Sequence, residues 1–520
     1  MSSPSSRRTL RRVTTAVSGA VLLAAAAGVA LAGDDVAPAE PVGVEDVTVP
    51  VDAATVAQVC PGPPRLATAL AGEDLGYDEF DPQGSGTSAT LDVLTIARGE
   101  DEPPGALSLR PTLDAPPGEE VPLAGAARLA ELTDVGEATA LEAEPVEDVV
   151  ALAAGTSAAV TESGDLRGLV ATACQSPSTS AWLLGGSTEP GDSAQLVLSN
   201  VGQTPASVTL SGWGSTGALD LSGAGSVLVP AGGQRVVLLE SLVGDPRLAV
   251  HVAATGGEVT ALVQDSRLRG LVPGGTDLVA PSVPPAESVV VPGISLGSAS
   301  GEEADAPAVR VVNPGEETAT VTLELLGVEG VEPVPGADDL VLDPGAVLDI
   351  SLAGMPGGPW SAVVTADQPV TAAAVSTLVG EPGEDDPSTP PVDRAWAPAT
   401  TAVAGGVIAL PGDVVSAVSL VLANPADSAV DVELVPVMRD GTRGEPVSRT
   451  VEARTSLREV VADLGDVAAM ELRVADGAVH AAALLSVPVD DGSLMSVVPV
   501  TEDARAARAV VLAPGRRSLG

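Results

Sequence analysis

Apolar and polar residues alternate with a period of two around a short stretch that occurs three times. Apolar residues stand four and two positions before an Asn and again six, eight and ten positions after it, and the three Asn are Asn200, Asn313 and Asn424. The chain has no other Asn, and the copies are 313 − 200 = 113 and 424 − 313 = 111 residues apart. Alternation on both sides of a turn predicts two half-buried strands. Asn favours the turn because its side chain bonds nearby backbone groups.

A second apolar stretch follows each of these turns at nearly the same spacing. It is centred on Val259, Val370 and Val479, which are 370 − 259 = 111 and 479 − 370 = 109 residues apart. Each copy follows another apolar run, so we expect it to form the second strand of a hairpin. The segment Gly164–Val170 looks like a weaker fourth copy. The first domain of the chain is therefore predicted to be a divergent relative of the other three.

These repeats predict an all-β chain of tandem immunoglobulin-like β-sandwich repeats. About six to eight strands in about 110 residues match the size of such a sandwich, whereas a propeller blade has about 40–45 residues. The expected domains are a divergent N-terminal β domain and three repeats, at 34–180, 181–280, 281–400 and 401–520. The third domain includes a Pro-rich linker and the last a basic tail. We interpret Pro273–Pro285 and Glu381–Pro398 as semi-rigid spacers between repeats.

Residues 1–33 predict a signal peptide or an uncleaved signal anchor. Four Arg precede an uncharged run, Val13–Gly33, which ends in the small residues Ala30 and Ala32 before Gly33, a cleavage pattern. The same run is long enough to cross a bilayer uncleaved, and Ser6–Leu10 partly resembles a twin-arginine signal. In each case the positive-inside rule places residues 34–520 outside the cytoplasm. The protein is expected to be secreted, or anchored to the cell membrane by this segment alone.

The two cysteines fit an exported protein. Cys60 and Cys174 both lie in the first exported domain, and export permits a disulfide between them. A catalytic thiol is the alternative, but that domain contains no His to activate it.

The charge balance excludes one class of partner. The formal net charge is −45, and all 25 basic residues are Arg. Nucleic-acid binding depends on clustered basic side chains that neutralise phosphates, so no nucleic-acid partner is expected. A hydrophobic content of 45% argues against wholesale disorder.

No residue pattern predicts a catalytic, metal or cofactor site. His251 shares its place in the repeat with Val363 and Arg473, and His480 shares its place with Thr residues, so both are interpreted as ordinary strand positions. Two His and two Cys give no metal-ligand spacing, and the acidic clusters lack that of a calcium loop. Aromatic residues make up 1% of the chain, which is few for a sugar-binding platform. We interpret Trp182 as a core residue, Trp396 as a linker residue and the three Asn as structural.

Three segments resemble an uncharacterised family of actinobacterial exported proteins with repeated β modules. They are Gly164–Leu169 leading to Cys174, Trp182–Thr188 and Gln264–Leu271. The resemblance covers most of the exported region and implies a secreted or membrane-tethered protein, with no activity to carry over.

The expected function is that of a non-enzymatic exported cell-envelope protein of structural or interaction type. It would act through acidic β-sandwich surfaces on cell-wall or envelope protein partners. One alternative is a binding module for cell-wall polysaccharide or peptide. A second is an exported hydrolase that uses acids of the first domain.

Overall fold

A computed structural model describes residues 47–50, 53–66, 87–99, 102–297, 305–383, 388–503 and 509–512. The chain divides into two compact units, 1–51 with 508–520, and 52–507. In the first, β1 (Val47–Pro50) pairs antiparallel with β36 (Ala509–Leu512). The predicted signal and cleavage residues, Ala30, Ala32 and Gly33, lie outside the described residues, as does most of the predicted basic tail.

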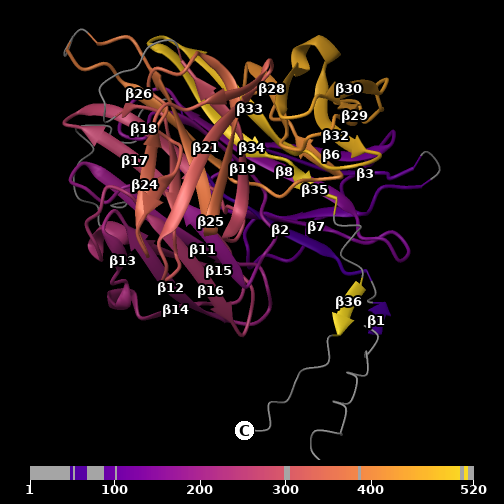
Figure 1. Ribbon diagram of the computed structural model, residues 1–520. Helices are drawn as coiled ribbons and strands as arrows, with labels where there is room; N and C mark the ends of the chain where they lie inside the picture. The colour runs from indigo at the N-terminus through magenta and orange to yellow at the C-terminus, as the bar shows by residue number, and fades with distance from the viewer. Residues whose placement is uncertain are drawn as a thin grey trace, which may run out of the picture. The chain divides into compact units, whose positions relative to one another are not determined.

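The second unit is all-β, as the sequence predicts, and its strands form antiparallel sheets (Figure 1). The described residues contain short 3₁₀ turns at Ser222–Ala224, Leu239–Ser241 and Val461–Leu464, but no α-helix. None of them belongs to a helix long and apolar enough to cross a membrane.

The strands of the first part of this unit, up to Ala173, form two sheets. The smaller has the order β2 (Val56–Cys60), β7 (Thr139–Ala143) and β4 (Leu107–Arg110). The larger has the order β5 (Leu123–Ala124), β6 (Ala127–Thr133), β3 (Ser88–Ile96), β8 (Leu152–Thr161) and β9 (Gly168–Ala173).

The next part of the chain also forms two sheets. Because the first part is counted as the first repeat, we call this part the second repeat and the two that follow it the third and fourth. One has the order β10 (Ser180–Leu184), β16 (Ala249–Thr255), β12 (Ala206–Gly214) and β13 (Gly217–Leu219), with β14 (Ser226–Val229) also on β12. The other has the order β15 (Gly233–Leu238), β11 (Asp192–Asn200), β17 (Thr260–Arg269) and β18 (Val272–Val279).

In the third repeat one long strand, β25 (Gly358–Val379), belongs to both halves. One half contains β19 (Ala286–Leu296), β21 (Ala319–Gly327), β22 (Gly330–Pro333) and β23 (Leu340–Leu342). The other contains β20 (Ala308–Val312), β24 (Val347–Ser351) and β26 (Val392–Pro398).

The fourth repeat returns to two separate sheets. One has the order β30 (Val447–Val451), β29 (Val430–Met438), β32 (Val467–Val474), β27 (Gly405–Ala409) and β35 (Thr501–Glu502). The other has the order β31 (Thr455–Val460), β28 (Ala417–Asn424), β33 (His480–Val489) and β34 (Gly492–Pro499).

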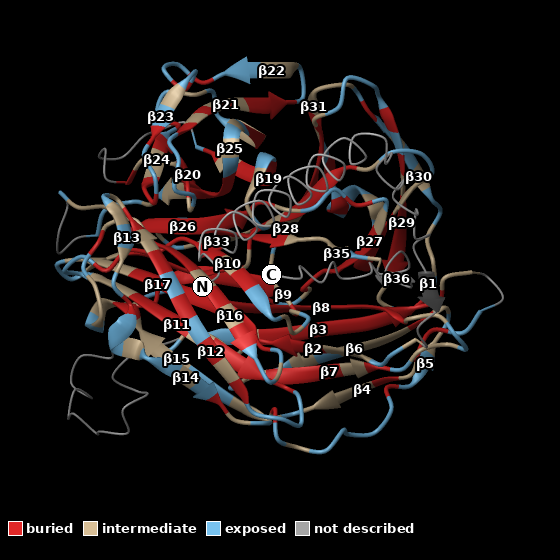
Figure 2. Cartoon of the chain, turned by 60° about the horizontal axis from the view of Figure 1, so that its bottom comes forward, coloured by how far each residue is buried: buried red, intermediate tan, exposed pale blue. Residues whose placement is uncertain are grey.

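Two hydrophobic patterns produce two kinds of strand. In β12 alternate residues are buried, because one face packs on the core and the other does not. In β8 all ten residues are buried, and its sequence is correspondingly an almost unbroken run of small and apolar residues. Figure 2 shows the difference: β8 and β26 are buried along most of their length, whereas the residues of β22 are intermediate or exposed.

The hydrophobic cores of the repeats are shared rather than separate. One cluster joins Leu196 of the second repeat to Val375 of the third, and the next joins Val291 of the third to Val497 of the fourth. Two more clusters join the fourth repeat to the first and the first to the second. The edge strands β9, β18, β26 and β34, which we call the closing strands, meet accordingly: β18 packs on β9 and β26, and β34 packs on β26 and β9. The four parts therefore bury their cores against one another in a closed cycle.

Cys60 and Cys174 form a disulfide, which points to an extracytoplasmic compartment. It joins the end of β2 to the residue after β9 and therefore connects the two sheets of the first part. A crosslink spanning 114 residues stabilises the fold, by the chain-entropy argument by about 4–5 kcal/mol.

The structure corrects the prediction of spacers between the repeats. Pro273–Pro285 contains most of β18, and Glu381–Pro398 contains β26, every residue of which is buried. Trp396, interpreted as a linker residue, is 1% exposed, and its indole N–H donates to Asp265 at 2.8 Å. Closing strands resemble linkers in sequence because Pro and Gly flank them.

The hairpin prediction is also wrong. The two strands do not pair with each other. β16 belongs to one sheet and β17 to the other, because the chain crosses from one sheet to the next between Thr255 and Thr260. The supposed fourth copy, Gly164–Val170, covers the turn after β8 and the start of β9, so β8 takes the place of β17 in the first part.

Candidate functional site

The candidate site begins with a row of side chains on the outer face of the second repeat. The strand register places His251 of β16 between Trp182 of β10 and Ser211 of β12. The alternate residues Leu183, Val250 and Leu210 belong to the core. Because successive strand side chains point to opposite faces, Trp182, His251 and Ser211 lie on the other face of the sheet, where Trp182 is partly buried and still packs against the core cluster.

The three rings of this face stack on one another. The ring centroids of Trp182 and Trp213 are 5.1 Å apart at an interplanar angle of 24°, and those of Trp182 and His251 are 4.5 Å apart at 26°. The Nε2 atom of His251 lies 2.9 Å from Ser180 Oγ, which fixes the imidazole in the stack. Burial lowers the pKa of His251, so the imidazole is neutral at pH 7. We call Trp182, Trp213 and His251 the aromatic platform.

A cavity of about 490 Å³ lies between the aromatic platform and the third repeat. Its other wall is the turn Asn313–Glu317 together with Gln368 and Pro369. Glu316 and Glu317 are exposed, and Gln368 is half-buried. The cavity therefore combines aromatic faces on one side with carboxylate and amide groups on the other, the combination that small-molecule sites use for affinity and orientation.

The third repeat fills the same place with aliphatic side chains. The pair Trp182–His251 corresponds in register to Val290–Val363 of the third repeat. Trp213 follows its Asn by 213 − 200 = 13 residues, as Leu326 does by 326 − 313 = 13. Val290, Leu326 and Val363 are buried together with Ala423 in one hydrophobic cluster at the boundary with the fourth repeat. The second repeat thus has a cavity where the third has a packed contact.

The Asn turn that forms the far wall is fixed by its own side chain. Asn313 is fully buried; its Oδ1 accepts from the Gly315 N–H at 3.0 Å, and its Nδ2 donates to the carbonyls of Glu317 and Leu342 at 2.7 and 3.2 Å. Asn200 and Asn424 make the corresponding bonds in their repeats. This side chain leaves no polar atom for a ligand, and its part in the site is to hold the wall.

The remaining candidate residues do not form a second site. His480 is buried, with Nδ1 2.9 Å from the Thr400 carbonyl oxygen, and burial lowers its pKa to about 4. Within the described ranges no group of three or more His, Cys, Asp or Glu is arranged to hold a metal ion.

The aromatic platform was not predicted from the sequence, because His251 was compared only with Val363 and Arg473 at the same place in the other repeats. Trp182, interpreted as a core residue, packs against the core but is only partly buried and also lines the cavity. The signal was present: Trp182, Ser211, Trp213 and His251 all fall on the polar phase of their strands. What the sequence did not contain was the pairing of β10 and β12 through β16.

Comparisons with known proteins extend over the middle of the chain. Residues 129–462 match the family described as "Family of unknown function (DUF5719)". No curated protein matches the chain. A solved structure, "Crystal Structure of Thermotoga maritima 1070", aligns with 22% of this chain and 93% of that chain at 18% identity. Its TM-score of 0.17 is too low to carry an argument about fold or function.

Proposed function

We propose that this chain, which belongs to the family of unknown function DUF5719, is a non-enzymatic exported cell-envelope protein that binds wall polysaccharide on the aromatic platform. Secretion or anchoring by residues 1–33, an actinobacterial source and the immunoglobulin-like character of the repeats are parts of the same proposal. Of the functions expected from the sequence, this proposal favours a binding module over a protein that acts only through acidic surfaces.

The observation that supports it is the gathering of scarce aromatic side chains in one cavity. The chain has four Trp and two His in 520 residues, and two of the Trp and one His line this cavity. A pyranose ring has an apolar face of C–H groups that packs on an indole, and hydroxyls at its edge that bond to carboxylates and amides. Trp182 and Trp213 provide the first surface, and Glu316, Glu317 and Gln368 provide the second.

The third repeat supports the same reading. An aliphatic contact would hold the second and third repeats together, as Val290, Leu326 and Val363 do at the next boundary. Replacing three aliphatic side chains by rings that leave an open cavity sacrifices packing at this boundary. A ligand contact gives a reason for that loss.

The test is co-sedimentation of the full chain with purified actinobacterial cell walls, followed by titration of soluble wall fragments against intrinsic tryptophan fluorescence. Trp182→Ala and Trp213→Ala should each weaken binding by about tenfold, because one aromatic contact contributes about 1.4 kcal/mol. Trp360→Phe is the matched control: Trp360 is also partly buried, but its indole N–H donates to Pro356 within its own repeat and it does not line the cavity.

The variants must retain the wild-type thermal unfolding midpoint to be interpretable. Binding that is unchanged in both platform variants would sink the proposal. Release of soluble fragments from the walls by the wild-type chain would instead favour the exported hydrolase.

A further inference from the structure

A second cavity, of about 460 Å³, is lined by five arginines in a protein of net charge −45. Arg267 and Arg269 belong to β17 of the second repeat, and Arg310 and Arg394 to β20 and β26 of the third. Arg247 lies just before β16. One fifth of all basic residues, 5 of 25, thus face one hollow between two repeats. We call the hollow that these five residues line the arginine cavity.

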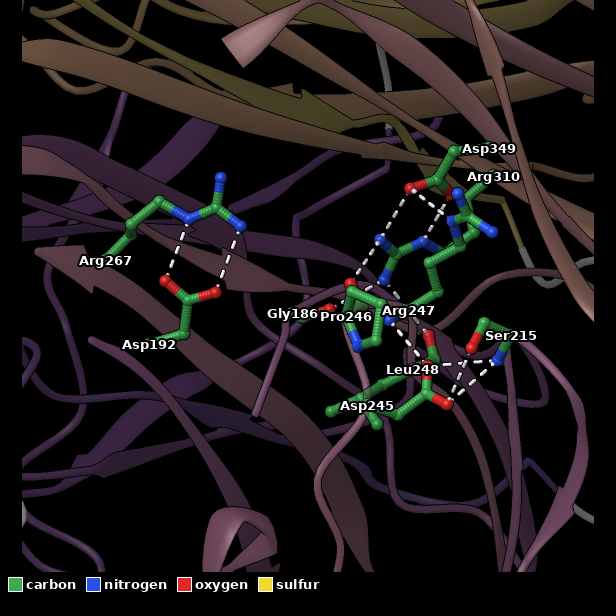
Figure 3. Close-up of polar contacts among 10 residues, drawn as sticks. All are labelled: Gly186, Asp192, Ser215, Asp245, Pro246, Arg247, Leu248, Arg267, Arg310 and Asp349. Carbon is green, nitrogen blue, oxygen red and sulfur yellow. Dashed lines mark hydrogen bonds and ion pairs between the residues drawn. The ribbon is translucent and has the colours of Figure 1, made fainter. Parts of the chain in front are cut away.

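Ion pairs with aspartates hold the guanidinium groups in place. Arg267 contacts both oxygens of Asp192, at 2.8 and 3.0 Å, and Arg310 contacts both oxygens of Asp349, at 2.8 and 2.9 Å. Figure 3 shows Arg247 directed at the same Asp349, whose Oδ2 is 3.6 Å from the Arg247 Nε. Bidentate pairs of this kind fix the plane and direction of each fork. The cavity is therefore organised before any ligand enters.

Arg310 is held in place by backbone carbonyl groups as well as by an aspartate. Besides Asp349, it donates to the carbonyl oxygens of Gly186 and Pro246, at 2.7 and 3.3 Å (Figure 3). Its side chain is 4% exposed. These bonds attach a third-repeat arginine to the backbone of the second repeat, so the cavity is rigid across the boundary.

Arg394 is the least satisfied of the five. Its side chain is 9% exposed, and its Nη1 has an ion-pair distance of 3.2 Å to Asp265 but no hydrogen-bond acceptor within the described part of the chain. The Nε of Arg269 also has none there. A buried donor without an acceptor destabilises the protein unless a ligand supplies the acceptor. Burial and the neighbouring Arg267 and Arg310 lower the pKa of Arg394, an effect that Asp265 opposes.

The charges of the cavity leave room for an anion. Five arginines face four lining carboxylates, those of Glu189, Asp192, Asp305 and Asp349, so 5 − 4 = 1 positive charge remains in the lining. Asp265 does not line the cavity, but its ion pair with Arg394 brings the total charge to zero, so an anion would be held by the unsatisfied N–H donors of Arg394 and Arg269 rather than by excess charge. Guanidinium groups approach from strands of two repeats, and a tetrahedral phosphate offers oxygens in several directions, whereas a planar carboxylate matches a single fork.

We propose that the arginine cavity binds a phosphate ester, with Arg394 and Arg247 as its contacts beyond the existing ion pairs. The volume exceeds that of a bare phosphate ion, and Leu268, Ala308 and Val375 add an apolar part to the lining that an esterified carbon chain would cover. The proposal does not depend on the sugar site, because the two cavities have no lining residue in common.

The test is calorimetric titration of the full chain with glycerol phosphate, inorganic phosphate and acetate at low ionic strength, where screening is weak. We expect one saturable site for glycerol phosphate, weaker binding of inorganic phosphate and weaker binding still of acetate. Arg394→Gln should reduce the affinity by about tenfold or more, and Arg247→Ala by a smaller factor.

Two features keep this test decisive. Arg247 is 37% exposed on its side chain and has one distant ion pair, so Arg247→Ala reports on binding even if Arg394→Gln destabilises the fold. Arg235, exposed on β15 of the same repeat and bonded to the adjacent Gln234 carbonyl, provides the control Arg235→Ala, which should bind as the wild type does. The proposal is overturned if no saturable binding appears, if acetate binds as tightly as glycerol phosphate, or if both cavity variants bind normally.

Discussion

At the scale of single residues, the centre of the cycle contains ionisable groups where apolar ones would be expected. Asp277 on β18 and Asp393 on β26 are buried among the closing strands. Asp393 Oδ2 accepts from the Met495 N–H at 2.6 Å, and Asp277 Oδ2 accepts from the Trp396 N–H at 2.6 Å. Burial raises the pKa of both carboxyl groups, that of Asp393 to about 8. Each therefore joins two closing strands, and Asp393 does so largely as a neutral acid at pH 7.

This raised pKa predicts a pH-dependent stability. A carboxyl group of the unfolded chain ionises near pH 4, whereas folded Asp393 keeps its proton up to about pH 8. The folded state then binds more protons, so its contribution to stability is complete below about pH 4 and is lost as the pH rises to about 8. The free energy of unfolding should fall through this window by about 1.4 kcal/mol per pH unit from this group.

Asp393→Asn removes that titration and keeps an oxygen for the Met495 N–H. Urea unfolding from pH 5 to pH 8 should show a correspondingly shallower slope in Asp393→Asn than in the wild type. Asp476→Asn, at an exposed position in a turn, should leave the slope unchanged. Equal slopes in wild type and Asp393→Asn would contradict the assignment.

At the scale of elements, the Asn turns are the most regular part of the structure. Each follows a buried strand whose last residue is the Asn or its neighbour, and in each the Nδ2 group bonds a carbonyl 27–29 residues further on. The side chain thus joins the turn to the end of a strand that pairs with the strand after the turn: β14 with β12, β23 with β21 and β30 with β29. Each of these side chains bonds one N–H and at least two carbonyl oxygens.

Asn313→Ala should therefore lower the free energy of unfolding by about 3 kcal/mol, since it leaves the Glu317 and Leu342 carbonyls and the Gly315 N–H without their partner. Chemical denaturation measures the loss. Asn313→Asp keeps the acceptor for Gly315 but places a carboxylate against two carbonyls, so its penalty should be larger at pH 7 than at pH 4. A loss below about 1 kcal/mol in Asn313→Ala would mean that the turn is held by its backbone alone.

At the scale of the whole molecule, the closed cycle makes the repeats interdependent. The closing strand of each part is buried by its neighbours, as Val170 of β9 is by Leu262 and Leu278. Close approach enforces the contact: a Cβ added at Gly168 would lie 2.6 Å from the Thr276 carbonyl oxygen of β18. A repeat cut out of this arrangement would expose a strand that is apolar on both faces.

The expectation is that residues 52–507 unfold in a single cooperative transition, and that the excised segment 181–280 is insoluble or lacks one. Differential scanning calorimetry of the full chain, with circular dichroism of the excised segment, measures both. A soluble excised repeat with a sharp thermal transition would show that the core shared with Val375 and Trp396 is dispensable.

The sequence alone was sufficient for the features that depend on local order. Period-two alternation around Asn200, Asn313 and Asn424 identified the all-β class, because a strand's burial pattern is written in consecutive side chains. The count and position of Cys60 and Cys174 identified the disulfide, because no other pairing exists. Both inferences need no knowledge of which strand lies beside which.

Only the tertiary structure decided which repeats touch one another. Both cavities depend on those contacts. β18 and β26 resemble linkers in isolation, since their burial comes from other repeats and leaves no periodic signal. Trp182, Trp213 and His251 become one surface only through the register of β10, β16 and β12. The arginine cavity likewise combines residues up to 394 − 247 = 147 positions apart. Such contacts depend on how closed sheets stack, and that is decided by packing free energy summed over the whole molecule rather than by any local pattern.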